Sequence, residues 1–422
     1  MTVKLLSSWG AQPSGTLYTT DAATETAMVT SKVATATLTG GVPWLPSLGT
    51  PNVGDGGVVS KYPLAQFWKG PMPKLAAARS RGPAAPPRIA FTGDSNLCGD
   101  SAAGASSSIG ARSLCFPFLI ARALGWQTGT IFGDQNMASA STATTPNQYD
   151  PRVVLGSGVT VGAAGVTFGG RAFELAVASG FLSFTPTVAD GLFDKVRFCF
   201  ARTATVSSAS VDILIDGVVV GNVSQVGAND TMYSPTYTVT KGSHLIQLRN
   251  NDGAQIARIT GIETWDSTNG APILLQGGWC GGKLSDLSNA ALGYNCLPTL
   301  ATMQPDAVLL HCTINDMINA TAIATVSAGI DAINLAMGGT ADVINTVSFA
   351  VNLAKTLDGT LDSYASLLRA NAASYGGAFA DARAATGSSY GVASSRGFTS
   401  NIYHPSAAGQ VAIAGMFQQL FQ

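Results

Sequence analysis

Near residue 90, and again after residue 270, short runs of apolar residues alternate with segments in which apolar residues recur every three to four positions. Short apolar runs predict strands at 88–92, 272–276, 306–312, 342–349 and 378–381. Segments with apolar residues three to four apart predict helices at 113–124, 321–337, 361–375 and 407–421. Strands that alternate with helices form parallel sheets covered on both faces. We therefore expect a flavodoxin-like, three-layer α/β fold with strand order 2-1-3-4-5.

A different pattern occupies residues 149–270. Apolar and polar residues alternate with period two, as in 195–200, 211–217 and 243–248, and Asp-Gly turns separate the runs. Many short strands at close spacing predict an all-β sandwich. We expect this sandwich to interrupt the α/β domain, which then comprises residues 89–148 and 271–422.

The first part of the chain carries no cluster of catalytic residue types. Residues 1–70 consist of short segments broken by turn residues. Residues 71–88 contain five prolines, a composition that favours extended chain and resists packing. We expect a separate N-terminal region followed by an extended linker.

Composition excludes several classes of partner. The 23 Lys and Arg residues balance 24 Asp and Glu residues, and no basic run could neutralise a row of phosphates. Nucleic acid and anionic membranes are therefore disfavoured as partners. We find no transmembrane span and no signal peptide at the start of the chain.

Metal and disulfide chemistry are also disfavoured. The six cysteines include no C-x-x-C pair, and the three histidines are far apart, so no zinc-type spacing occurs. A chain of 422 residues can bury a sizeable core without covalent links, so we expect free, buried thiols. No metal or other cofactor is implied.

Four short segments carry the residues suited to catalysis. Gly93-Asp94-Ser95 follows the first strand, a glycine-rich loop at 277–282 follows the second, and Asn315-Asp316 follows the third. His404-Pro405 precedes the last helix. In an open parallel sheet, ligands bind at the carboxyl ends of the strands, where this order would bring the loops together.

These four blocks, in this order, resemble those of the SGNH (GDSL-type) hydrolases. The resemblance implies that Ser95 is the nucleophile and His404 its general base. It also implies an oxyanion hole formed by the Ser95 amide, Gly281 and Asn315. The chemistry agrees, because a serine hydroxyl needs a base within hydrogen-bond reach, and an oxyanion needs fixed N–H donors.

Three positions depart from the family pattern. Gln276 stands where an Asn is usual, and Thr313 where a Gly is usual. Asn401 stands three residues before His404, where the family has the Asp that orients the imidazole. Asn401 could orient the ring through its carbonyl oxygen, a backbone carbonyl could serve a Ser-His dyad, or a natural Asp could have been replaced. These three explanations stay open at this point.

Other candidate residues have structural interpretations. Residues 387–391 match G-x-S-x-G, but they lie in a Gly/Ser loop and not between a strand and a helix. His244 lies in an alternating strand and His311 ends the third strand of the α/β domain. Asp381 ends the fifth strand, and we expect it to be a structural carboxylate.

The regions outside the catalytic blocks add a weaker resemblance. The insert looks like the jelly-roll modules of some carbohydrate esterases, which stack aromatic side chains on sugars. Candidates are Tyr233, Tyr237 and Trp265, although core packing is the expected role of each. The low charge of the chain and its N-terminal region look similar to bacteriophage tail proteins. On that resemblance, residues 1–70 attach or oligomerise an extracellular or virion-associated protein, and homo-oligomers are expected.

Together these expectations describe a serine esterase with the site Ser95, His404 and Asn401. The expected reaction is removal of O-acetyl groups from a bacterial surface polysaccharide through an acyl-serine intermediate. One alternative is a lipase or thioesterase of the same fold. Another is a glycan-binding structural virion protein whose hydrolase site is weakened.

Overall fold

The chain divides into two compact units, residues 1–65 and 66–422. In the first unit, the computed structural model describes only three antiparallel strands, β1 (Thr2–Leu5), β2 (Leu17–Thr19) and β3 (Ala34–Thr37). The proposed attachment role of residues 1–70 therefore lies almost wholly outside the described residues. In the second unit the structure describes 67–102, 110–134, 137, 146–162, 167–203, 210–252, 255–349, 358–387 and 389–422.

A six-stranded sheet lies at the centre of the second unit, in the order β18-β5-β19-β20-β21-β4. The first five of these strands are parallel and β4 is antiparallel. Counted along the chain, the parallel strands follow the order 2-1-3-4-5, so the predicted topology is confirmed. The strands are β4 (Phe67–Lys69), β5 (Arg88–Gly93), β18 (Ile273–Gly278), β19 (Ala307–His311), β20 (Asp342–Val347) and β21 (Ala378–Asp381).

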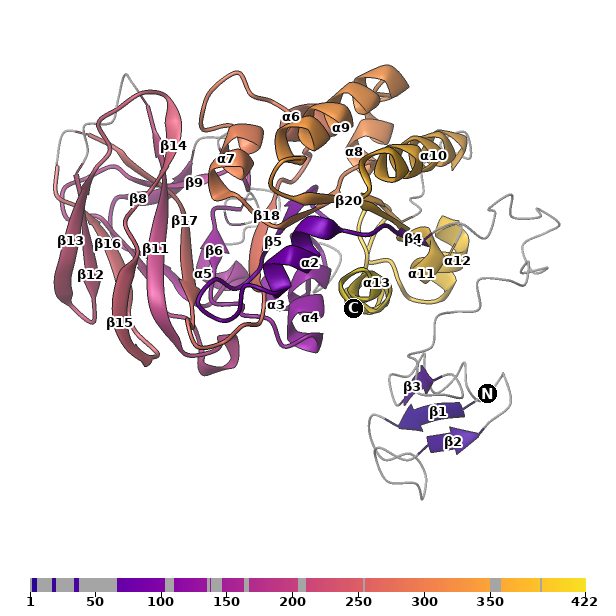
Figure 1. The fold of residues 1–422 in the computed structure, drawn as a ribbon, viewed down its shortest axis with the longest axis horizontal. Helices are drawn as coiled ribbons and strands as arrows, with labels where there is room; N and C mark the ends of the chain where they lie inside the picture. The colour runs from indigo at the N-terminus through magenta and orange to yellow at the C-terminus, as the bar shows by residue number, and fades with distance from the viewer. Residues whose placement is uncertain are drawn as a thin grey trace. The chain divides into compact units, whose positions relative to one another are not determined.

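Helices cover both faces of this sheet, with α6, α9 and α10 on one side and α4 and α13 on the other (Figure 1). The five parallel strands are almost entirely buried between these layers. The helices are α2 (Pro73–Arg79), α3 (Ala111–Leu114), α4 (Phe116–Ala123), α5 (Pro146–Tyr149), α6 (Leu284–Leu287), α7 (Cys296–Met303), α8 (Ile314–Ile318), α9 (Ile323–Met337), α10 (Asp358–Tyr375), α11 (Arg383–Thr386), α12 (Tyr390–Ser395) and α13 (Ala407–Phe417).

The helix expected at 113–124 is two helices, because the chain is extended at Cys115 (φ −72°, ψ 146°). Pro117 explains the break. In a continuous helix its ring would clash with the carbonyl group four residues earlier. Proline is tolerated in the first turn of a helix, and α4 therefore begins anew at Phe116.

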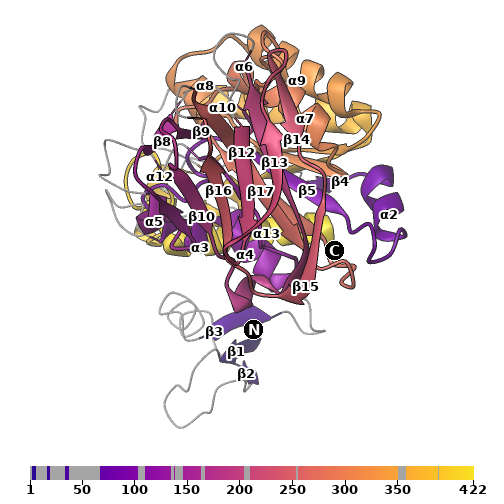
Figure 2. The same cartoon turned by 90° about the vertical axis from the view of Figure 1, so that its left-hand side faces the viewer.

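The predicted β-sandwich is present (Figure 2). In sequence, most of its strands lie between the two parts of the α/β domain. One sheet has the order β13-β12-β16-β10-β7, and the other β14-β11-β17-β9-β8, with β15 beside β11 and β6 beside β17. All of these pairs are antiparallel. The strands are β6 (Ile131–Phe132), β7 (Val153–Leu155), β8 (Val159–Gly162), β9 (Ala172–Leu175), β10 (Phe181–Phe184), β11 (Phe193–Arg202), β12 (Ser210–Ile215), β13 (Val218–Ser224), β14 (Asp230–Tyr233), β15 (Tyr237–Gly242), β16 (Ile246–Asn250) and β17 (Ala257–Trp265).

Local sequence explains the sharpest turn of the sandwich. Strands β12 and β13 are joined by Asp216 and Gly217, with φ of 51° and 80°. Two positive φ angles are what a two-residue hairpin of type I′ requires, and Asp-Gly is a favoured pair for it. Inside the sandwich, the side chains of Phe173, Phe184 and Phe198 are fully buried.

The expectation of an extended linker over residues 71–88 is wrong. Residues 73–79 form α2, with Pro73 in its first turn, and Leu75 and Ala78 are almost fully buried. Proline at this position favours a helix start, because its fixed φ suits the helix and its missing N–H would have no partner there. The Leu75 amide also donates to Asp342 Oδ2 at 2.8 Å, which ties α2 to β20.

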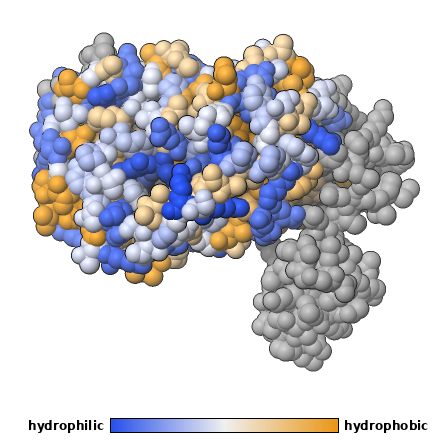
Figure 3. Space-filling view, viewed as in Figure 1, coloured by the Kyte–Doolittle hydropathy of each residue, from blue (hydrophilic) through white to orange (hydrophobic). Residues whose placement is uncertain are grey.

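The surface of the second unit mixes polar and apolar residues. On the face drawn in Figure 3, apolar side chains occur singly or in small groups among polar ones. Within the described parts of the chain, no helix has the length and hydrophobicity needed to cross a bilayer.

Candidate active site

The candidate residues lie at the carboxyl ends of three adjacent strands. Ser95 follows β5, Gly281 lies in the loop after β18, and Asn315 lies in α8, which follows β19. Backbone hydrogen bonds link these loops across the sheet end. The Asp94 amide donates to the His311 carbonyl at 2.9 Å, and the Trp279 amide donates to the Gly93 carbonyl at 2.8 Å.

The loop before α13 brings His404 to Ser95. The Ser95 Oγ lies 2.9 Å from His404 Nε2, and His404 Nδ1 lies 3.1 Å from Asn401 Oδ1. This arrangement joins residues more than 300 positions apart in the sequence. His404 therefore links the other two residues predicted from the motifs, through one hydrogen bond to Ser95 and one to Asn401.

Asn401 is held in one orientation by its other contacts. Its Oδ1 accepts the backbone amides of Tyr403 and His404 at 2.8 and 2.9 Å, and its Nδ2 donates to Ser101 Oγ at 3.2 Å. The carbonyl oxygen therefore faces the imidazole, so Nδ1 carries the ring proton and Nε2 is free to accept. Of the three explanations for Asn401, this geometry matches orientation of the ring through the amide oxygen.

Two opposing influences act on His404. Burial lowers the pKa of the imidazole below its usual value, and the nearby Asp100 carboxylate raises it. Asp100 Oδ2 lies 3.5 Å from Nε2, and the two side chains are only 14% and 15% exposed. Since the net shift is downward, His404 is neutral at pH 7 and suited to accept a proton.

Three N–H donors lie at the same sheet edge. Among the described residues, the backbone amides of Ser95 and Gly281 form no hydrogen bond to a backbone carbonyl. Asn315 Nδ2 donates to the Gly282 carbonyl at 3.1 Å, which positions the side chain and leaves its second N–H available. The Gly282 amide closes a turn onto the Trp279 carbonyl at 2.8 Å, and Gly281 has a φ of 78°, so glycine is required there.

Three buried side chains hold successive carbonyl groups of the loop that follows Ser95. Gln410 Nε2 of α13 donates to Asn96 O at 2.9 Å, and Gln276 Nε2 of β18 donates to Leu97 O at 3.2 Å. Tyr149 Oη donates to Cys98 O at 3.1 Å. Preorganised loops of this kind keep a reactive side chain in place. Gln276, which departs from the family pattern, is thus an anchor of this loop.

The other departure, Thr313, also has a structural explanation. Its Oγ1 accepts the Ser348 amide at 3.0 Å, which links the ends of β19 and β20. Below the site, Ser348 Oγ lies 3.4 Å from both Asp94 Oδ2 and His311 Nε2. Burial raises the pKa of Asp94 to about 7 and lowers that of His311 to about 3. Neither group contacts Ser95 Oγ or the His404 ring in the described structure.

The alternative candidates have other contacts. Ser389 of the G-x-S-x-G segment caps α12, and its Oγ accepts the Val392 amide. His244 contacts Asp216 and the Thr240 carbonyl in the sandwich. Asp381 is bound by Arg383 through four contacts of 2.6–3.0 Å. These residues serve local structure, as expected.

The insert lies directly beside the glycine-rich loop. The Phe168 ring packs on Gly277, and the Trp279 ring packs on Gly170, where a Cβ atom would come within 2.8 Å of the indole. The turn 167–170 of the insert therefore contacts the loop that also carries Gly281.

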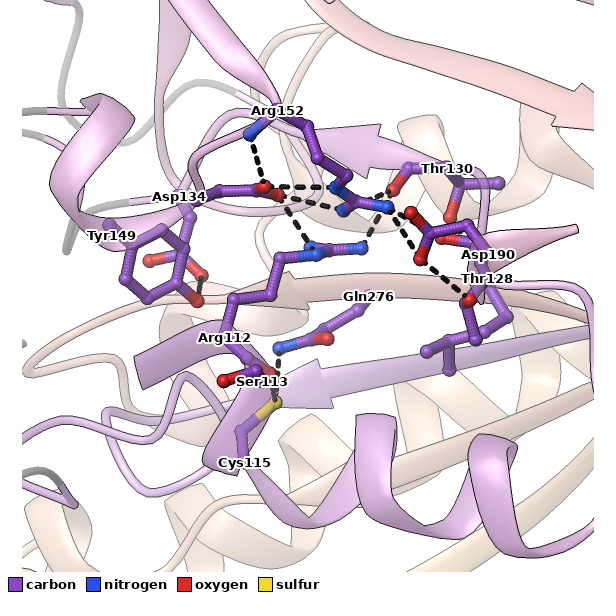
Figure 4. A network of polar contacts seen from close by, with 12 residues as sticks. Arg112, Ser113, Cys115, Thr128, Thr130, Asp134, Tyr149, Arg152, Asp190 and Gln276 are labelled. Atoms are coloured by element: carbon purple, nitrogen blue, oxygen red, sulfur yellow. Dashed lines mark hydrogen bonds and ion pairs between the residues drawn. The ribbon is translucent and has the colours of Figure 1, made fainter. Parts of the chain in front are cut away.

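A buried polar network crosses the junction between insert and α/β domain (Figure 4). Asp150 forms ion pairs with Arg112 of α3 at 3.0 Å and with Arg152 at 2.7 Å, and Arg152 reaches Asp190 at 3.1 Å. Burial alone would raise the pKa of Asp150, but the two arginines hold it below its usual value. The insert is thus fastened to the α/β domain and not merely linked to it.

The three aromatic candidates for sugar stacking are engaged in the sandwich. The guanidinium of Arg197 lies over the rings of Tyr233 and Trp265, 4.3 and 5.7 Å from their centroids. Tyr237 packs on Phe198, with centroids 6.0 Å apart. None of the six cysteines, all of which lie in described ranges, forms a disulfide bond, and all but Cys280 are buried. Within the described ranges, no group of three or more His, Cys, Asp or Glu side chains is arranged to hold a metal ion.

Sequence reasoning missed Asp100 and Ser101. They lie in the loop that carries Ser95 and contact His404 and Asn401, respectively. A carboxylate five residues after the candidate nucleophile was the available signal. Tyr149 and Gln410 were missed as well, since nothing in their local sequence points to the loop they hold.

A solved structure shares this fold. A peptidoglycan O-acetylesterase is 17% identical, with a TM-score of 0.58, over 82% of this chain and 93% of that chain. More distant are an acetylxylan esterase from Geobacillus stearothermophilus (18% identity, TM-score 0.31, 36% and 73% of the chains) and a carbohydrate esterase family 2 enzyme with a carbohydrate-binding domain from Corynascus thermopiles (13%, 0.28, 63% and 97%). With TM-scores this low, these two structures do not bear on the fold or function of this chain. No family profile and no curated sequence matches the chain.

The sheet order, the inserted sandwich and the first of these similarities define the fold. It is an SGNH-type α/β fold with a β-sandwich insert.

Proposed function

We propose that this protein is a serine esterase that removes O-acetyl groups from a polysaccharide. The observation that carries the proposal is the contact of Ser95 Oγ with His404 Nε2 at 2.9 Å, with Asn401 Oδ1 behind the ring. A neutral imidazole with its acceptor nitrogen at a serine hydroxyl is the arrangement needed to activate that hydroxyl.

In the first half of the reaction, Ser95 Oγ attacks the ester carbonyl carbon while its proton passes to His404 Nε2. The amides of Ser95 and Gly281 and the side chain of Asn315 donate to the oxyanion that forms. The bond to the sugar oxygen then breaks. That oxygen takes the proton from Nε2 and leaves as a hydroxyl group, with the acetyl group on Ser95.

In the second half, a water molecule gives a proton to His404 Nε2 and attacks the acetyl-Ser95 carbonyl. The same three donors stabilise the second oxyanion. Its collapse returns the proton to Ser95 Oγ and releases acetic acid, which ionises at neutral pH. The resting site is thereby restored.

For the substrate we propose an O-acetylated bacterial surface polysaccharide. The insert beside the glycine-rich loop supports a substrate larger than a simple ester, because Trp279 and the turn 167–170 extend the wall of the site. Peptidoglycan is the first polysaccharide to test. The solved structure described above that covers 82% of this chain is a peptidoglycan O-acetylesterase. We also propose an extracellular or virion-associated location and attachment through residues 1–70.

The test is acetate release by the full chain and by Ser95→Ala, with 4-nitrophenyl acetate and O-acetylated peptidoglycan as substrates. We expect Ser95→Ala to lower the rate by ~10³-fold or more, because the nucleophile is removed. Ser389→Ala is the matched control and should retain activity. Equal rates for the full chain and Ser95→Ala would contradict the proposal, and absence of activity in both would favour a glycan-binding protein.

A further inference from the structure

The contacts of Asp100 address a problem that Asn401 creates. When Ser95 gives up its proton, His404 becomes a buried cation, and an amide cannot offset that charge. We propose that Asp100 is the acidic partner of His404, supplying from the nucleophile loop the negative charge that position 401 lacks. The inference rests on the proposed esterase function of the same site.

Asp100 is placed for this role by backbone and side-chain contacts. Its amide donates to the Ser95 carbonyl at 3.1 Å, so it moves with the nucleophile loop. Its Oδ1 accepts the Ser101 hydroxyl at 3.2 Å, and its Oδ2 lies 3.5 Å from His404 Nε2. Gly99 and Ser101 on either side have φ of 72° and 58°, a tight backbone path that directs Asp100 toward the histidine.

The contacts form a closed ring of four side chains. His404 Nδ1 donates to Asn401 Oδ1, Asn401 Nδ2 donates to Ser101 Oγ, and Ser101 Oγ donates to Asp100. Asp100 completes the ring at His404 Nε2. The direction of these donors suits an amide at 401. With a carboxylate there, the single Ser101 proton would have to serve two anions.

The interaction favours the transition state over the resting state. In the resting enzyme, Nε2 presents a lone pair, which gains nothing from a carboxylate at 3.5 Å. Once Nε2 holds the proton, the same carboxylate faces a cation in a largely buried site. Interactions that strengthen only as charge develops raise the rate. Since 3.5 Å exceeds an ordinary hydrogen bond, the proton stays available to the leaving sugar oxygen.

Other titratable groups belong to the neighbouring loops. Asp94 is the other acid of the nucleophile loop, and burial raises its pKa to about 7. Cys280 of the glycine-rich loop is within electrostatic reach of Asp100 and Asp94. The Tyr403 ring lies 6.4 Å from the His404 ring, centroid to centroid. In the described structure, Asp100 is the carboxylate that forms an ion pair with His404.

The test is a cycle of Asp100→Asn, Asn401→Asp and the double variant in the full chain, with kcat/KM for 4-nitrophenyl acetate measured against pH. We expect Asp100→Asn to lower kcat/KM by about tenfold to 100-fold. It should also move the acid limb of the profile to lower pH by about one unit, because a carboxylate that raises the histidine pKa is lost. A merely structural role would not shift that limb.

The two positions should be coupled. Asn401→Asp should raise kcat/KM more in the Asp100→Asn background than in the wild-type background, because only the first of these lacks a carboxylate beside the ring. Equal effects of Asn401→Asp in both backgrounds, or an unchanged pH profile for Asp100→Asn, would overturn the inference. Ser95→Ala separates the two proposals: if it abolishes activity while Asp100→Asn does not alter it, only the role of Asp100 fails.

Discussion

Asp94, beside the candidate nucleophile, is a carboxyl group with no exposed surface. Its Oδ1 accepts the Asn96 amide at 2.9 Å, and its Oδ2 faces the Ser348 hydroxyl at 3.4 Å. Burial outweighs these contacts and raises its pKa from 3.8 to about 7. The folded protein therefore binds the Asp94 proton more tightly than the unfolded chain does.

This shift predicts a pH-dependent stability. A carboxyl group with a raised pKa in the fold contributes stability below about pH 4, which is lost as pH rises to about 7. The wild type should lose up to about 4 kcal/mol of its free energy of unfolding between pH 4 and 8, because Asp94 ionises. Asp94→Asn cannot ionise at this position and should not show this loss. Urea unfolding at several pH values measures this. A constant difference between the two proteins would refute the assignment.

At the scale of the element, α2 is a short helix that the sequence did not predict, because the prolines around it favoured an extended chain. Its seven residues begin with proline and contain three alanines, yet Leu75 is 1% exposed and packs into the core of the α/β domain. The helix is tied to the first residue of β20 by the hydrogen bond from Leu75 to Asp342, and the preceding β4 pairs with β21 at the edge of the sheet.

Leu75→Ala should therefore destabilise the second unit by about 2–5 kcal/mol, because a buried leucine is replaced by a cavity. The matched control is Leu335→Ala in α9, where the side chain is 81% exposed and the change should cost under about 0.5 kcal/mol. Denaturant unfolding compares them. If Leu75→Ala cost as little stability as Leu335→Ala, α2 would not be part of the cooperative fold.

The sequence predicted the elements whose signals are local. Gly93-Asp94-Ser95 and Asn315 follow adjacent strands, so the strand order alone brings them to one edge, and His404 directly precedes the last helix. The role of α2 was missed because prolines outweighed its two buried positions. Asp100 and Ser101 were missed because their partners lie about 300 residues away, and only the packing of α13 against α4 brings them together.

At the scale of the whole molecule, the two compact units divide at residue 65, and the candidate site lies entirely in the second. The second unit holds its own sheet, sandwich and both hydrophobic clusters. All described residues of these clusters belong to the second unit.

A chain that begins at Gln66 should therefore fold and keep the kcat/KM of the full chain for a small acetyl ester. Thermal unfolding and 4-nitrophenyl acetate hydrolysis, each measured on both chains, provide the check. A large loss of either quantity in the shorter chain would show that residues 1–65 support the site, which would count against an attachment role alone.

The ion pair between Arg112 and Asp150 crosses the junction and fixes the insert relative to the α/β domain. A binding module on a loose tether searches a volume and presents its ligand from many directions. This insert is clamped through Asp150 to Arg112, and its Tyr149 holds the nucleophile loop itself. If the polysaccharide proposed above binds the insert, these contacts would hold the bound strand at a fixed distance from Ser95.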